Sequence, residues 1–146
     1  MNISDFISTE EAQRACRKLG IRDWTTLTNT EVPLDEAEII REAVGSEALQ
    51  IPVEWFQQGL EVELEHGMQF PDANVTNNHP LLTGKIVLAH LKEMLDYYLR
   101  LEAAELEGDM LKASRKGDAE KLARIYRRLL DARAKLSAWE NGGLKA

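Results

Sequence analysis

The chain has 146 residues, of which 44% are hydrophobic and 29% are charged, and its formal net charge at pH 7 is −7. This length and hydrophobic share suit one folded domain and exclude a disordered chain. The single cysteine, Cys16, excludes an internal disulfide and a cysteine-based zinc cluster. No apolar run approaches the length of a membrane span and none near the start reads as a signal peptide, so we expect a cytoplasmic protein that does not contact a membrane.

Residues 7–50 are predicted to form small helices that pack on the rest of the chain. Ser8 and Glu11 have the spacing of a capping box, which predicts a helix that ends at Leu19 with Gly20 as its cap. A second helix is predicted over residues 33–44.

The next predicted helix covers residues 52–66 and carries the first candidate site residues. Gly67 fits the left-handed cap after its last residue. Placed at 100° per residue, Glu63 falls on the apolar face of this helix, and His66 lies at the edge of that face. The other three glutamates of the segment fall on the opposite, solvated face.

A longer helix is predicted to run unbroken over residues 81–107. Its periodicity places His90, Glu93 and Tyr97 in one stripe beside a broad apolar arc, whereas Lys85 lies on the wet edge. The two helices together are predicted to form a central antiparallel hairpin covering residues 51–107. In a level hairpin His90 would face Gly59 and Phe56. If the connection from Gly67 to His79 lets the second helix start well beyond the end of the first, the antiparallel order sets His66 against His90 and Glu63 against Glu93.

These four side chains allow two interpretations. A carboxylate inside an apolar stripe must find a donor, a cation or a metal ion. Imidazoles and carboxylates three residues apart on helices suit a zinc, iron or manganese ion, which predicts a metal site of Glu63, His66, His90 and Glu93. Alternatively, the same residues and Tyr97 form a buried hydrogen-bond network that fixes the helix register. We favour the network, because di-iron bundles need two Glu-x-x-His motifs and this chain supplies one.

The C-terminal segment, residues 109–141, is predicted to form a long amphipathic helix over residues 118–140. Its apolar residues recur with heptad spacing, which favours packing on the chain's own long helix or a homodimer through this helix. Residues 112–135 hold nine Lys or Arg and three Asp or Glu, whereas residues 1–107 hold eight and twenty. The acidic body repels phosphate, so we do not expect nucleic-acid binding.

Three blocks in the middle of the chain resemble a known family: GLEVELEHG (59–67), PDANVTNN (71–78) and TGKIVLAHLKEMLDYYLRL (83–101). They resemble a bacterial and viral family of short proteins of unknown function. The resemblance implies that the candidate residues occupy motif positions, but it implies no activity for them. Asn74, Thr76 and Asn77 of the second block have side chains that bond nearby backbone groups and can order the connection between the helices. Where the family often has proline, this chain has Leu95, which predicts a straighter helix.

The sequence therefore predicts a single soluble all-α domain, residues 1–146, built as a small helical bundle with a long C-terminal helix. We expect a non-catalytic interaction or structural module with a buried Glu/His/Tyr network. The alternatives are a divalent-metal-binding bundle and an enzyme that uses Glu63 or Glu93 as a base. We disfavour the enzyme, because spacing alone indicates neither a nucleophile nor an oxyanion stabiliser.

Overall fold

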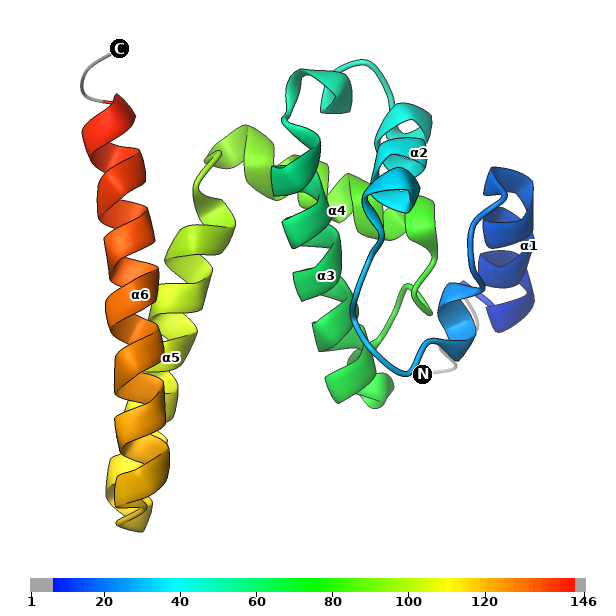
Figure 1. The fold of residues 1–146 in the computed structure, drawn as a ribbon. Coiled ribbons are helices and arrows are strands. Elements are labelled where there is room, and N and C mark those ends of the chain that lie inside the picture. Colours follow the sequence, from blue (N-terminus) through cyan, green and yellow to red (C-terminus); the bar gives the residue numbers. More distant parts are fainter. Residues whose placement is uncertain (1–6, 144–146) are drawn as a thin grey trace. The chain divides into compact units, whose positions relative to one another are not determined.

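The fold was analysed in a computed structural model, which describes residues 7–143 (Figure 1). These residues form helices and no strands, as predicted. They divide into two compact units, one ending at Glu93 and one beginning at Met94. None of the described helices combines the length and the apolar run needed to cross a bilayer.

In the first unit, residues 7–93 form four α-helices and three short 3-10 helices. Ser8 caps α1 by accepting a hydrogen bond of 3.2 Å from the backbone N–H of Glu11, and Gly20 ends this helix with a φ of 71°, so both predicted ends are confirmed. The elements are α1 (Thr9–Leu19), η1 (Trp24–Thr26), α2 (Leu34–Val44), η2 (Ala48–Gln50), α3 (Val53–Gln69), η3 (Pro71–Ala73) and α4 (Pro80–Glu93).

The core of this unit lies where α2, α3 and α4 pack on one another. Gly84 allows the closest approach, because a Cβ atom there would lie 2.7 Å from Val44 Cγ2 and 2.9 Å from Ile40 Cγ2. Large fully buried side chains of this unit include Trp24, Ile40, Phe56, Leu60, Leu64 and Val87.

The predicted end of the third helix at Gly67 is wrong. Helix α3 continues to Gln69, and Gly67 is an ordinary helical residue. A Cβ atom at Gly67 would lie 2.5 Å from Asn78 Oδ1 and 2.9 Å from Asn74 Nδ2. This glycine therefore makes room for the loop that follows and does not end the helix.

The predicted continuous helix over residues 81–107 is also wrong. Helix α4 ends at Glu93, a turn follows, and α5 (Tyr97–Lys116) begins after Asp96. Asp96 is buried, and its carboxylate pairs with Arg100 of the first turn of α5 at 2.7 Å. The chain thus breaks here although Leu95 occupies the position where proline is common, and Asp96 flanks the start of α5 without a side-chain capping hydrogen bond.

The second unit is a pair of adjacent helices, α5 and α6 (Ala119–Gly143), joined at Gly117 (Figure 1). The heptad positions of α6 pack on α5, as predicted. Across the pair, Arg133 binds Glu107 at 2.6 Å and Arg100 binds Glu140 at 2.9 Å. The buried core of this unit comprises Ala103, Leu106, Ala113, Ile125, Leu129 and Ala132.

Candidate functional site

One carboxylate and two imidazoles lie together where α3 meets α4. Glu63 Oε1 lies 3.7 Å from His90 Nε2, and Glu63 Oε2 lies 4.0 Å from His66 Nδ1. The Glu63 side chain is 15% exposed, whereas those of His66 and His90 are 42% and 30% exposed. The acid is therefore shielded between two half-exposed imidazoles.

Three further predicted residues lie on α4 and α5. Glu93 is exposed at the last position of α4. Tyr97 belongs to α5, where its ring meets that of Tyr98 edge to face at 5.1 Å. Lys85 is exposed on α4, as its place on the wet edge predicts. Because α4 ends at Glu93, the single predicted helix that aligned Tyr97 with His90 and Glu93 is interrupted.

The loop after α3 is held by its asparagine side chains. Asn74 Nδ2 donates to the backbone carbonyl of Gly67 at 3.2 Å and to Asn78 Oδ1 at 2.8 Å, and Thr76 Oγ1 donates to Asn74 Oδ1 at 3.2 Å. The Gly67 carbonyl lies in the last turn of α3, where carbonyls lack helical partners, so Asn74 satisfies one of them. The loop thereby folds back over the end of α3.

Two further asparagines connect this loop to the N-terminal segments. Asn77 and Asn78 have φ angles of 47° and 57°, a left-handed conformation that asparagine tolerates better than most residues. Asn77 donates to the backbone carbonyl of Ile7, and Asn78 donates to that of Trp24 at 3.4 Å. The loop is thus hydrogen-bonded both to the end of α3 and to the N-terminal segments.

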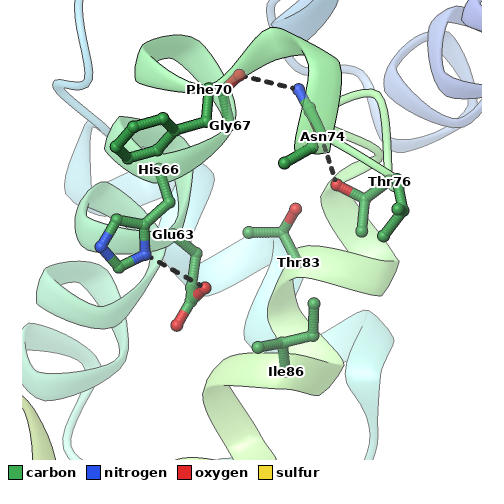
Figure 2. Close-up of a pocket in the computed structure, with 10 residues that line it drawn as sticks. Glu63, His66, Gly67, Phe70, Asn74, Thr76, Thr83 and Ile86 are labelled. Atoms are coloured by element: carbon green, nitrogen blue, oxygen red, sulfur yellow. Dashed lines mark hydrogen bonds and ion pairs between the residues drawn. The ribbon is translucent and has the colours of Figure 1, made fainter.

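A pocket of about 210 Å³ opens between α3, this loop and α4 (Figure 2). Figure 2 shows the Glu63–His66 pair and the Asn74–Thr76 pair on opposite sides of it. Apolar groups complete the wall, and two of them, Phe70 and Val75, remain 51% and 53% exposed. The lining residues are Glu63, His66, Gly67, Phe70, Ala73, Asn74, Val75, Thr76, Thr83 and Ile86.

The pocket brings together residues from all three sequence blocks that carry the family resemblance. The sequence identified Glu63, His66, Asn74 and Thr76, but it did not identify the apolar wall. Alternation of loop and helix residues around a cavity leaves no periodic signal, so spacing could not have found these wall residues.

The structure gives the metal hypothesis no support. Within residues 7–143, no group of three or more His, Cys, Asp or Glu side chains is arranged to hold a metal ion.

Glu36 is a buried carboxylate outside the pocket lining, and sequence analysis missed it. Glu36 is 6% exposed, and Arg22 binds both of its oxygens, at 2.8 and 3.0 Å, while Trp24 Nε1 donates to it at 3.2 Å. Burial by itself raises the pKa of Glu36, but the hydrogen bonds from Arg22 outweigh it and the pKa is lowered. Glu36 shares a helical face with Ala37 and Ile40, so the projection that identified Glu63 could have found it.

The third histidine, His79, has a structural role at the start of α4. It is 8% exposed, and its Nδ1 accepts a hydrogen bond of 3.4 Å from the backbone N–H of Leu82. Burial lowers the pKa of His79. The neutral ring therefore caps the helix, because a protonated Nδ1 could not accept this bond.

Residues 12–107 match the model of the DUF5661 family, whose members are proteins of unknown function. No curated protein and no solved structure matches the chain.

Proposed function

The chain belongs to the DUF5661 family, and from this premise we propose that its first unit is a non-catalytic binding module that takes a small organic cation in the pocket between α3 and α4. The observation that carries the proposal is the placement of Glu63. Its carboxylate lines the pocket between two imidazoles, and none of the ten lining residues is Lys or Arg.

Charge favours a cationic ligand. Residues 1–93 contain seven Lys or Arg and sixteen Asp or Glu, a net charge of −9 with histidine neutral. Such a surface attracts cations and repels anions before any contact forms. Within the pocket, Glu63 supplies the negative charge, and Asn74 and Thr76 supply oxygen atoms on the opposite side.

Size and the apolar rim restrict the ligand further. The volume of about 210 Å³ is below the roughly 300–1,000 Å³ typical of pockets for drug-sized molecules. The exposed ring of Phe70 can attract a cation through its face, and Val75 offers apolar contact. The ligand is therefore a short amine with an apolar body, which exists free or as the basic side chain of a partner protein.

We favour binding over catalysis because of the chemistry of the lining residues. The lining residues include neither a thiol nor an amine that could act as a nucleophile.

Amide NMR spectra of the full chain, titrated with benzylamine, benzyl alcohol and benzoate, test this proposal. Benzylamine should shift the resonances of α3, the loop and α4, whereas the neutral and anionic analogues should not. Titration with Nα-acetyl-lysine methylamide distinguishes a free amine from a protein side chain as the preferred source. Equal shifts with benzyl alcohol, or no shifts with either amine, would refute the proposal.

A matched pair of variants isolates the carboxylate. Glu63→Gln keeps the shape but removes the charge, and it should weaken benzylamine binding at least about fivefold, or about 1 kcal/mol. Glu65→Gln removes an exposed charge that lies on the same helix but outside the pocket lining, so it should leave the affinity nearly unchanged. Equal losses in both variants would mean that only the general charge of the unit matters.

A further inference from the structure

The helix pair of the second unit carries exposed apolar side chains that its own core does not use. Leu111 of α5 and Tyr126 and Leu130 of α6 are 53%, 49% and 48% exposed. We call these three residues the hairpin patch. Single exposed apolar residues are ordinary, but three that share one face form a candidate contact surface.

Helix geometry places the three residues on one face. The buried residues of each helix define the direction in which that helix faces its partner. At 100° per residue, each patch residue is rotated from this direction by about a quarter to a third of a turn, in the same rotational sense on both helices. In antiparallel helices, the same sense from the core leads to the same face. Glu107 and Arg133 are displaced in this sense too, and they pair across the helices at 2.6 Å, which supports the assignment.

The register agrees with this placement. The pairs Glu107–Arg133 and Arg100–Glu140 connect the two helices along their length. Continuing the same register toward Gly117 brings Leu111 level with residue 129, beside Leu130 and one turn from Tyr126.

Charge is divided along this helix pair. The turn end, residues 110–128, contains seven Lys or Arg and two Asp or Glu, a net charge of +5. The open end, residues 97–109 and 129–143, contains three Lys or Arg and six Asp or Glu, a net charge of −3. Each hairpin is therefore basic at one end and acidic at the other.

We propose that the hairpin patch is covered by the hairpin patch of a second copy of this chain, with the two hairpins antiparallel. A two-fold axis through the patch makes the apolar contact self-complementary, as a symmetric dimer requires. It also brings the basic turn end of each copy beside the nearest acidic residues of the other, Glu107 and Asp109. A parallel arrangement would stack the two +5 ends, which like-charge repulsion disfavours.

The mass of the full chain, followed by sedimentation over a concentration series, tests the dimer. Dimers should form, and their dissociation constant should rise several-fold when NaCl is raised from about 0.05 to about 0.5 M, because salt screens the end-to-end attraction. Leu130→Glu should weaken dimerisation at least tenfold. Leu34→Glu is the matched control, because Leu34 is equally exposed, at 47%, but lies in the first unit, and it should not change the mass.

A circular dichroism spectrum confirms that each variant is folded. A monomer at every concentration, or a dimer that Leu130→Glu leaves intact, would overturn the proposal. Association that occurs only when a DNA duplex is added would overturn it as well, and would assign the basic turn end to nucleic acid.

Spin labels test the orientation. With the buried Cys16 replaced by alanine, a label at Lys116→Cys marks the turn end. The register puts the patch about four residues from the level of Lys116 and about thirteen from that of Asn141, at about 1.5 Å per residue. In the antiparallel dimer the two Lys116 labels should therefore be offset by only about 15 Å along the helices, whereas two labels at Asn141→Cys, at the open ends, should be about 40 Å apart. A short distance between the two Asn141 labels would overturn the antiparallel arrangement.

Discussion

The contact at Gly84 gives a sharp test of the packing in the first unit. A Cβ atom at this position would lie 2.7 Å from Val44 Cγ2 and 2.9 Å from Ile40 Cγ2. Both neighbours are β-branched, and these methyl groups sit directly on their Cβ atoms, so they have little rotamer freedom. Relief therefore requires α2 and α4 to move apart, and Gly84→Ala should destabilise this unit.

The magnitude follows from two opposing effects. Overpacking a core costs typically about 1–3 kcal/mol, and the stiff neighbours place this site in the upper part of that range. Alanine also favours the helix over glycine by about 1 kcal/mol. The free energy of unfolding of the first unit should therefore fall by about 1–2 kcal/mol.

Gly108→Ala is the matched control. Gly108 lies inside α5, and a Cβ atom there would meet nothing within 4 Å. Only the helix preference changes, so this variant should be more stable than the wild type by about 1 kcal/mol. The same substitution thus has opposite signs at the two glycines.

Residue-resolved amide hydrogen exchange measures both effects, because it gives each unit its own opening free energy. Slower exchange of the core amides of α4 in Gly84→Ala would refute the close packing of α2 on α4. A destabilised α5 in Gly108→Ala would refute the open surroundings of that glycine.

Three further predictions concern polar groups. The pKa of His79 is lower in the folded chain than in the unfolded chain, so protonation favours unfolding, and the free energy of unfolding should fall as pH drops below about 6.5. Urea titrations at several pH values measure this dependence. His79→Asn keeps a capping oxygen but has no titrating group, so it should remove the dependence. Glu36→Gln leaves Arg22 without its charged partner and should lower the free energy of unfolding by about 2 kcal/mol. Glu38→Gln, at the half-exposed pair with Arg41, should lower it by under about 1 kcal/mol. Equal shifts of the melting temperature in the two variants would contradict this prediction. Ser8→Ala should cost about 1 kcal/mol and speed exchange only in α1, and unchanged exchange there would exclude the cap.

The sequence predicted well the features that neighbouring residues decide. Ser8 and Gly20 fix the ends of α1 through contacts within four residues, and the heptad spacing of α6 selects the face that packs on α5. The predicted helix ends were wrong where a residue typical of a helix end also contacts side chains from a later part of the chain. Gly67 has the spacing of a helix cap, yet the side chains of Asn74 and Asn78 occupy the space beside it and the helix continues.

The candidate site shows the same division. Periodicity assigned Glu63 to the apolar face of its helix, and the family blocks identified Asn74 and Thr76, because both are properties of short stretches of sequence. Which groups meet was decided by the fold. Glu63 lies between His66 and His90 because α3 packs on α4, an association that no local pattern records.

By itself, then, the sequence determined that this chain is all-helical, where most of its helices begin, and which of their faces are apolar. Those properties depend on hydrogen bonds and side chains three or four residues apart. Only the tertiary structure decided that one carboxylate is shared by two imidazoles and that a pocket opens beside it. The reason is that the position of a chain reversal is set by contacts between residues far apart in the sequence, such as Asn77 with Ile7, and no local pattern records them.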